Sequence, residues 1–393
     1  MPTLSDKTIL ILSPQSWGTM FLSKHHYALE LARMGNKVYF LNPPDYGPAR
    51  SNNGPASPAI RIGPSGIHGN LMLISHRLWF PYLLKFHAMP LFHAGMRLQM
   101  KRVLKKIGRP IDIVWSFDLG NLCPLTWFGP PIYKIFHPVD EPSGPQAIAA
   151  AKGADIIFSV TREILEKYKA YPAPKHFINH GISPEFLPTG GFPVDSPHAV
   201  RGEPFRVGMA GNLLRSDLDR PTLIDIVATN PAVIFECWGS YTGGQSNIGG
   251  GGDKETHAFI AALQALPNVI LHGAVPAAEL AKGFSRMDAF LICYDIKKDQ
   301  SGGTNYHKIM EYLSTGKVII SNNVTTYKDM PVLMQMTAER DNNDRLPALF
   351  RQVIENLSTY NDPARQRERI EFACGNAYSR QVERIAQLIK DRK

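Results

Sequence analysis

Residues 302–320 read Gly-Gly-Thr-Asn-Tyr-His-Lys-Ile-Met-Glu-Tyr-Leu-Ser-Thr-Gly-Lys-Val-Ile-Ile, which combines a glycine-rich loop, a short helix, a glycine stop and a buried strand. Glycines before a helix leave its first amides open at the positive end of the helix dipole, which suits a phosphate. Lys308 and Glu311 project from one face of this helix. The lysine can meet a phosphate, and the carboxylate can accept hydrogen bonds from two neighbouring ribose hydroxyls. The pattern indicates a nucleotide-linked ligand; the alternative is an exposed ion pair on an ordinary helix.

Length and cysteine content narrow the class of protein. A chain of 393 residues exceeds what one core usually supports, so two domains are expected. The four cysteines form no CxxC pair, which argues against a thiolate metal site and favours the reducing cytoplasm. We expect Thr8–Leu12 to be a first strand rather than part of a signal peptide, and no apolar run is long enough to span a bilayer.

The net charge of +9 is concentrated in one region. Between His76 and Arg109 there is no acidic residue, and eight lysines and arginines alternate with aromatic and aliphatic side chains. Such a mixture suits the headgroup region of an anionic membrane, so we predict a peripheral membrane contact through residues 76–109, at the inner face of the membrane. The alternatives are a core helix with a solvated basic face, and nucleic acid. No nucleic-acid-binding signature supports the last, and we expect no nucleic-acid partner.

Strand and helix signals alternate along both halves of the chain, which predicts βαβ units and parallel sheets. The expected strands of the first half are Thr8–Leu12, Lys37–Leu41, Ile60–Ile62, Ile111–Ser116, Ile132–Phe136, Ile156–Val160 and His176–Asn179. Those of the second half are Phe205–Ala210, Val233–Trp238, Val269–Leu271, Ala289–Ile292 and Val318–Ser321. Helices are expected between them, including 221–229, 255–265, 277–286 and 305–314. The fold class is therefore α/β, with doubly wound sheets.

A segment rich in proline and glycine separates the two series of elements. We predict an N-terminal domain at 1–190, a linker at 191–204, a second domain at 205–375 and a C-terminal helix at 376–393. Ligands of open α/β sheets bind outside the carboxyl ends of the strands, so two such sheets would line an interdomain cleft.

Four segments, in this order, resemble those of GT-B glycosyltransferases, and in particular the retaining family-four enzymes of bacterial surface-polysaccharide synthesis. Asn305–Ile320 is similar to the family pattern N-x-x-K-x-x-E-Y-L-x-x-G-K-x-V-I. The other three are Asn179–Phe186, with a histidine inserted before its glycine, Val207–Asn212 and Asn268–Pro276. The resemblance implies two Rossmann-like domains that face each other across a cleft, with a C-terminal helix that crosses back to the first domain. It also implies transfer of a sugar from a nucleoside-diphosphate sugar to a hydroxyl of a carbohydrate or lipid-linked acceptor, with retention of configuration.

The resemblance assigns the donor to the second domain. It implies that Glu311 holds the ribose, that Lys308 lies near the diphosphate, and that the amides of Gly303, Thr304 and Asn305 bind phosphate or sugar oxygens. The remaining implied donor contacts are Gly211, Asn212, Arg215 as a second cation, and Val275 beside the base. An arginine that is merely paired with Asp217 or Asp219 is the alternative for Arg215. The family's two-glutamate pattern fails here, because its first position is Gly303.

The first domain would hold the acceptor. Gly18, in the turn after the first strand, permits a close approach to the donor phosphate. His25 and His26 begin one helix turn later and could face the cleft, although one of the two is expected to be a packed or surface histidine. His137 and Asp140 follow a buried strand and are the predicted catalytic residues. His137 could hydrogen-bond the donor sugar, and Asp140 or Glu141 could orient the acceptor hydroxyl. The alternative is that Asp140 is the N-cap of the next helix.

Neutralisation of the leaving diphosphate would lower the barrier, through a helix dipole, amides, Lys308 and Arg215. We expect no metal and no cofactor beyond the nucleotide sugar as co-substrate. A nucleotide-sugar epimerase of the same fold and a non-catalytic nucleotide-sugar-binding protein remain as alternatives. The glycines of 243–252 suggest a loop beside the cleft, and a phosphate cradle there is a weaker alternative.

Overall fold

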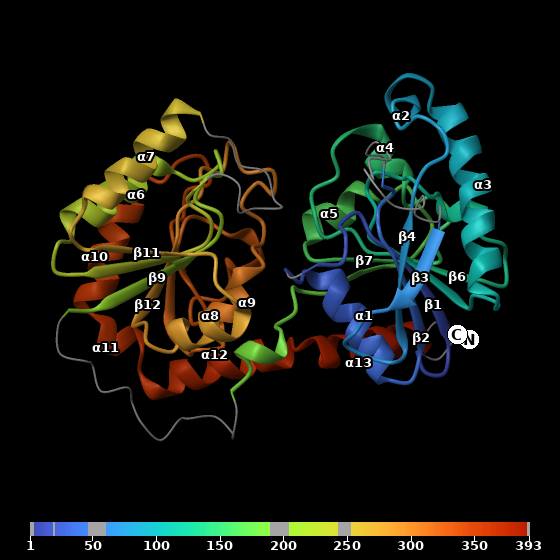
Figure 1. Ribbon diagram of the computed structural model, residues 1–393. Helices are drawn as coiled ribbons and strands as arrows, with labels where there is room; N and C mark the ends of the chain where they lie inside the picture. Colours follow the sequence, from blue (N-terminus) through green and yellow to red (C-terminus); the bar gives the residue numbers. More distant parts are fainter. Residues whose placement is uncertain (1–3, 19, 46–59, 189–203, 243–252, 391–393) are drawn as a thin grey trace. The chain divides into compact units, whose positions relative to one another are not determined.

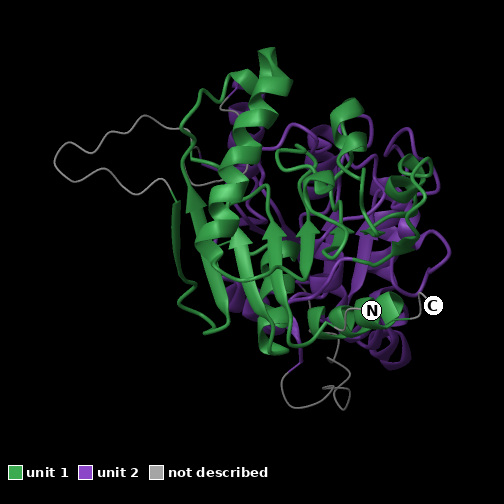
Figure 2. Cartoon of the chain, turned by 90° about the vertical axis from the view of Figure 1, so that its right-hand side faces the viewer, with its two compact units in different colours: residues 1–179, 378–393 green, residues 180–377 purple. Residues whose placement is uncertain are grey.

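The computed structural model describes residues 4–18, 20–45, 60–188, 204–242 and 253–390. Most of the predicted linker and the glycine-rich segment 243–252 lie outside the described residues. The chain divides into two compact units, 1–179 with 378–393 and 180–377 (Figure 2). The division falls between Asn179 and His180 rather than at residue 190, because the strand-like bridge of Ile182 to Ala377 ties the segment after Asn179 to the second unit.

Unit 1 is built on an eight-stranded sheet of order β3-β4-β2-β1-β5-β6-β7-β8. All neighbours are parallel except β3 and β4. The strands are β1 Thr8–Leu12, β2 Lys37–Leu41, β3 Ile60–Pro64, β4 Leu71–His76, β5 Ile113–Ser116, β6 Tyr133–Phe136, β7 Ile156–Ser159 and β8 Lys175–Phe177. Its helices are α1 Ser23–Arg33, α2 Leu84–His87, α3 Met89–Ile107, α4 Gly144–Ala149, α5 Arg162–Lys167 and α13 Tyr378–Lys390. Strand β4 was not predicted, although Leu71–Ile74 is a short apolar run like those from which other strands were predicted.

Unit 2 is built on a six-stranded, wholly parallel sheet of order β11-β10-β9-β12-β13-β14. The strands are β9 Arg206–Ala210, β10 Ile234–Trp238, β11 Val269–Gly273, β12 Ala289–Ile292, β13 Val318–Ser321 and β14 Gln335–Met336. The helices are α6 Arg220–Thr229, α7 Lys254–Ala265, α8 Ala277–Phe284, α9 Lys308–Leu313, α10 Leu346–Glu355, α11 Leu357–Tyr360 and α12 Pro363–Gly375. Every residue of β12 and β13 is buried, as expected of central parallel strands covered on both faces.

The C-terminal helix α13 returns to unit 1, as predicted. Its buried residues recur at helical spacing along one face: Tyr378, Gln381, Val382, Ile385 and Ile389. Two hydrogen bonds join it to α1, from Tyr27 Oη to Gln381 Oε1 at 2.5 Å and from Tyr378 Oη to Ser23 Oγ at 3.2 Å. Figure 1 shows α13 beside α1. No helix in the described ranges has the length and hydropathy that a membrane span requires.

Candidate functional site

The candidate site lies in unit 2, where the strand order reverses. From β9 the chain proceeds outward to β10 and β11 on one side, and from β12 to β13 and β14 on the other. The carboxyl ends of β9 and β12 therefore form the switch point at which open α/β sheets bind ligands. A pocket at this point is lined by Ala210, Gly211 and Asn212 after β9, by Tyr294 after β12, and by Lys308.

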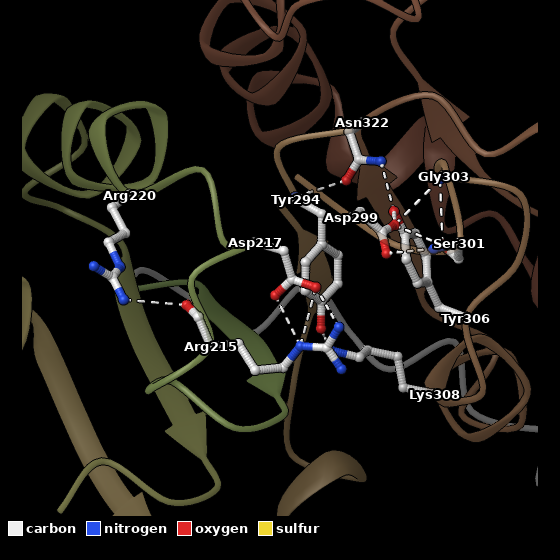
Figure 3. Close-up of polar contacts among 10 residues, drawn as sticks. All are labelled: Arg215, Asp217, Arg220, Tyr294, Asp299, Ser301, Gly303, Tyr306, Lys308 and Asn322. Atoms are coloured by element: carbon white, nitrogen blue, oxygen red, sulfur yellow. Dashed lines mark hydrogen bonds and ion pairs between the residues drawn. The ribbon is translucent and has the colours of Figure 1, made fainter. Parts of the chain in front are cut away.

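Lys308 begins α9 and joins the two sides of this switch point. Figure 3 shows its side chain beside Tyr294. Its Nζ donates a hydrogen bond to the carbonyl oxygen of Ala210 and another to Tyr294 Oη, at 2.7 Å. The ammonium also lies 4.8 Å from the centre of the Tyr294 ring. Because an ammonium group has three donors, these two hydrogen bonds leave one N–H of Lys308 without a hydrogen-bond acceptor among the described residues.

Two glycines make the close approach of Lys308 to the sheet possible. A Cβ on Gly211 would lie 2.8 Å from Lys308 Nζ, and one on Gly239 would lie 1.9 Å from the Gly211 carbonyl oxygen. Both residues have positive φ, 144° and 128°. The Gly211 amide donates to the Trp238 carbonyl oxygen at 2.9 Å. The predicted donor contact of Gly211 therefore has to come from something other than this amide.

Glu311 lies one turn after Lys308, and its side chain is only 15% exposed. Burial raises the pKa of its carboxyl group from 4.5 to about 7, with Lys308 opposing the rise and Glu185 adding to it. His307 Nδ1 is 3.5 Å from Glu311 Oε1. Among the described ion pairs none joins Lys308 to Glu311, so the two do not form the exposed surface pair considered as an alternative.

Arg215 is held by an aspartate. Its Nε donates to both carboxylate oxygens of Asp217, at 2.8 and 3.1 Å, and Nη2 contacts the same group. This hydrogen bonding raises the pKa of Arg215 above its ordinary value. The arrangement is the paired alternative considered for this residue. The guanidinium nevertheless lies 5.9 Å from the Tyr294 ring, beside the pocket.

The expectation of no metal assumed that the chain has no Asp-x-Asp triplet, but Asp217-Leu218-Asp219 is one, so that assumption was wrong. Both carboxylates already have protein partners. Asp217 binds Arg215, while Asp219 caps α6 by accepting from the Thr222 amide and also accepts from Asn343 Nδ2 at 2.8 Å. In the part of the chain that the structure describes, no group of three or more His, Cys, Asp or Glu residues is arranged to hold a metal ion.

The loop before α9 is closed around Asp299, which is buried (Figure 3). Its carboxylate accepts from the Gly303 amide at 3.2 Å, from Ser301 Oγ at 2.6 Å and from Tyr306 Oη at 2.8 Å. The Thr304 amide donates to the Ser301 carbonyl oxygen at 3.3 Å. Two of the amides predicted to bind phosphate thus donate within the loop.

The remaining predicted residues of this loop are also enclosed by protein. Asn305 is buried, and its Oδ1 accepts from Tyr327 Oη at 3.2 Å. Gly303 has a φ of 69°, and a Cβ there would lie 2.9 Å from the Asn323 carbonyl oxygen. A glutamate therefore does not fit at Gly303 in this loop conformation, which explains physically why the two-glutamate pattern fails.

The last two donor predictions lie in loops at the same edge of the unit 2 sheet. Asn212 follows β9, and its Oδ1 accepts from the Leu214 amide at 3.0 Å, which shapes the turn toward Arg215. Val275 follows β11, is half-buried and packs against the unit 2 core. Its main chain lies at the carboxyl edge of the unit 2 sheet, where the contact with the nucleobase was predicted.

In unit 1 the predicted catalytic residues are not arranged as a catalytic pair. His137 is fully buried among the rings of Tyr27, Trp115 and Phe117, and burial lowers its pKa to about 3. Asp140 is exposed. It does not cap the next helix, since the N-cap of α4 is Ser143. Because His137 is fully buried, the structure does not support the hydrogen bond to the donor sugar that was predicted for it.

The surroundings of Gly18, His25 and His26 in unit 1 bear on the remaining predictions for this unit. Gly18 is exposed, and a Cβ there would meet nothing within 4 Å, so its place in the fold does not require glycine. His25 is buried, accepts from the Leu22 amide at 2.9 Å, and has a pKa lowered by burial to about 4. His26 stacks on Tyr378 of α13. Both histidines are therefore packed rather than facing a ligand.

Tyr294, Asp299 and Asp118 are polar residues at strand ends that the sequence reasoning missed. Each follows a buried strand, β12 or β5, and that position was the available signal. Asp118 is buried and accepts from the amides of Gly120 and Leu122, at 2.8 and 2.7 Å. It lines a small pocket at the carboxyl ends of β1, β2, β4 and β5, together with Ser13, Asn42 and His76.

No protein-family model matches this sequence, and no curated protein sequence does. Solved structures match it over nearly the whole chain. Sucrose-phosphate synthase from Thermosynechococcus elongatus is 14% identical, with a TM-score of 0.66 and 98% of each chain covered. HepE of Anabaena, in complex with UDP and glucose, is 15% identical, with a TM-score of 0.62 over 98% of this chain and 99% of that one. The lipopolysaccharide outer core galactosyltransferase WaaB is 13% identical, with a TM-score of 0.64 over 98% and 100%. The chain therefore has the GT-B fold, with two Rossmann-like domains.

Proposed function

We propose that this protein is a glycosyltransferase that moves a sugar from a nucleoside-diphosphate sugar to a hydroxyl acceptor. The observation that carries the proposal is that Lys308 lines the pocket at the switch point of unit 2 and Glu311 follows it one helical turn later on α9. One offers a cationic donor toward the pocket, and the other offers a carboxylate that is largely shielded from water. Structures of similar fold include one in complex with UDP and glucose, which supports a nucleotide sugar as the donor.

In this reaction the bond between the anomeric carbon and the diphosphate oxygen breaks, and a bond forms from the anomeric carbon to the acceptor oxygen. The diphosphate leaves with an additional negative charge, and the proton of the acceptor hydroxyl passes, in the net reaction, to the solvent. We assign the stabilisation of that charge chiefly to the remaining N–H of Lys308. Arg215 is a weaker second cation, because Asp217 already offsets much of its charge. Glu311 would accept hydrogen bonds from the ribose hydroxyls in its ionised form.

Two finer parts of the proposal rest on the family resemblance: retention of configuration, and a lipid-linked saccharide or polysaccharide precursor as acceptor. The contacts proposed for Gly18, Gly211, Asn212 and Val275 also rest on it, as do those of residues 303–305. A location at the cytoplasmic face of a membrane is proposed from the basic and apolar stretch 76–109 and from the cysteines. Transfer without a metal ion is proposed because Asp217 and Asp219 already have protein partners. For His137 and Asp140 a catalytic role stays a prediction.

The first experiment is a thermal-shift screen with UDP, GDP, dTDP and their sugars, because a ligand that binds only the folded state raises the unfolding temperature. The best donor, radiolabelled in its sugar, is then incubated with a lipid-linked acceptor, with and without EDTA. We expect the label in the acceptor fraction, and a loss of that label in Lys308→Met. Epimerised free nucleotide sugar, or binding without turnover over a panel of acceptors, would contradict the proposal. A loss of transfer with EDTA would contradict only its metal-free part.

A further inference from the structure

An unusual concentration of exposed apolar side chains lies in one segment of unit 1, which comprises α2, α3 and the residues before them. Of the ten large hydrophobic residues that are exposed in the described part of the chain, five fall within 79–98. Leu83 and Phe86 are each 66% exposed, and Leu91 is 63% exposed. We call the exposed residues of this region the α2–α3 surface; its apolar members are Trp79, Leu83, Phe86, Leu91 and Leu98. Isolated exposed apolar residues need no explanation, whereas a cluster indicates a partner.

The fold holds these side chains outward. Helix α3 buries Phe92, Met96 and Val103 against the unit 1 core, so Leu91 and Leu98 lie on its outer face. A Cβ on Gly95 would lie 2.7 Å from Cε1 of Phe80, which shows that the Phe80 ring packs directly on this glycine. The segment before α2 is thereby fixed to α3. Figure 1 shows α2 next to the start of α3 in this unit.

Cations continue the same outer face. Arg97, Lys101, Arg102 and Lys105 are exposed along α3, and the guanidinium of Arg102 lies 5.4 Å from the Trp79 ring. Lys85 lies 5.7 Å from the Phe86 ring. No acidic residue occurs from His76 to Arg109 to offset this charge. The α2–α3 surface therefore presents apolar side chains bordered by positive charge.

We infer that the α2–α3 surface docks this protein on an anionic lipid bilayer. Aliphatic and aromatic side chains gain by entering the acyl boundary, and the surrounding cations gain from anionic headgroups. A second copy of the chain fits less well, because a symmetric contact would oppose like charges. Nucleic acid would satisfy the cations but leave Leu83, Phe86 and Leu91 exposed to water.

The position of this surface adds a link to acceptor binding, and this link rests on the proposed function. Strand β4 ends at His76, so the surface begins at the carboxyl edge of the unit 1 sheet, which also bears the pocket with Asp118. A Cβ on Gly120 would lie 2.9 Å from Asp118 Oδ1 and 3.7 Å from Lys85 Nζ, so the pocket and the surface adjoin. An acceptor that carries a lipid would be presented to unit 1 at this edge.

The test is co-sedimentation of the full chain with vesicles of phosphatidylglycerol and phosphatidylethanolamine, compared with vesicles of phosphatidylcholine alone. We expect binding only to the anionic vesicles, weakened by salt. In Lys101→Glu/Arg102→Glu the partition coefficient of the protein onto the anionic vesicles should fall at least about a hundredfold, since each positive charge near such a surface raises binding on the order of tenfold. In Leu83→Ser/Phe86→Ser it should fall about tenfold or more.

Matched controls keep the same chemistry on unit 2. They are Lys282→Glu/Arg351→Glu for charge and Ile270→Ser/Met330→Ser for exposed apolar area. All of these residues are exposed, so the variants should fold, which circular dichroism checks. Four results would each overturn the inference. They are equal binding to both kinds of vesicle, equal losses of binding in the control variants, preference for a DNA or RNA duplex over vesicles, and a dimer that Leu83→Ser/Phe86→Ser dissociates. Because the assay needs no sugar transfer, its outcome is independent of the proposed activity.

Discussion

Replacement of Glu311 by glutamine should stabilise the protein at high pH and weaken its ligand. Burial raises the pKa of Glu311 from 4.5 to about 7. A group whose pKa is raised in the folded state favours folding while it is protonated, and that contribution is lost as the pH rises through the folded pKa. Between pH 4.5 and about 7 the native state therefore gives up about 3 kcal/mol of unfolding free energy, at about 1.4 kcal/mol for each tenfold change in proton affinity.

Glutamine carries no charge at any of these pH values, so it avoids this loss. We expect Glu311→Gln to equal the native protein in unfolding free energy near pH 4.5, and to exceed it by up to about 3 kcal/mol at pH 8.5. The measurement is urea denaturation at several pH values. The control is Glu371→Gln, since Glu371 is exposed on α12 and its replacement should change little.

The same variant should bind the nucleotide less well. The amide of glutamine accepts through one oxygen instead of two, and loss of a hydrogen bond to a charged group weakens binding by about tenfold to a hundredfold. Calorimetric titration with the nucleotide chosen by thermal shift, at pH 8.5, measures this. A variant that is less stable than the native protein at pH 8.5, or whose stability difference does not vary with pH, would refute the reasoning about burial. Unchanged affinity would refute the ribose contact.

Three further substitutions test other parts of the structure. Lys308→Met should lower the rate of transfer by about 10²- to 10³-fold without changing the unfolding temperature by more than a few degrees, and an unchanged turnover number would remove the lysine from the reaction. Gly303→Glu restores the family pattern, but it places a side chain on a residue of positive φ and against the Asn323 carbonyl oxygen. We therefore expect a loss of about 2–4 kcal/mol of unfolding free energy and no gain in activity. A stable and faster variant would contradict this account. Arg369 is fully buried and donates hydrogen bonds to three backbone carbonyls, which Arg369→Met leaves without these donors. We expect urea denaturation to show a loss of about 3–5 kcal/mol of unfolding free energy. A loss below about 1 kcal/mol would show that those carbonyls find other donors.

Local patterns were sufficient to predict most elements. The strands Thr8–Leu12, Lys37–Leu41, Ala289–Ile292 and Val318–Ser321 have the predicted bounds, because a short apolar run between turn residues has few other structures available. The predicted helix 305–314 begins only at Lys308. The side chain of Tyr306 is hydrogen-bonded to Asp299 in the preceding loop, and that of Asn305 to Tyr327, which follows β13. Helix α12 was missed because its many charged residues obscure an apolar face.

The sequence by itself determined the α/β class, the two-domain organisation, the nucleotide-site pattern at Lys308 and Glu311, and the acid-free stretch from His76 to Arg109. Only the tertiary structure decided which polar groups were already satisfied. The contact from Lys308 to Ala210 spans 98 positions, and the enclosure of His137 brings together four separate parts of unit 1. Helix and strand signals reach only a few residues along the chain, whereas burial and hydrogen-bond partners arise when distant segments pack. That is why the elements could be predicted closely, while the roles of Gly303, Arg215 and His137 could not.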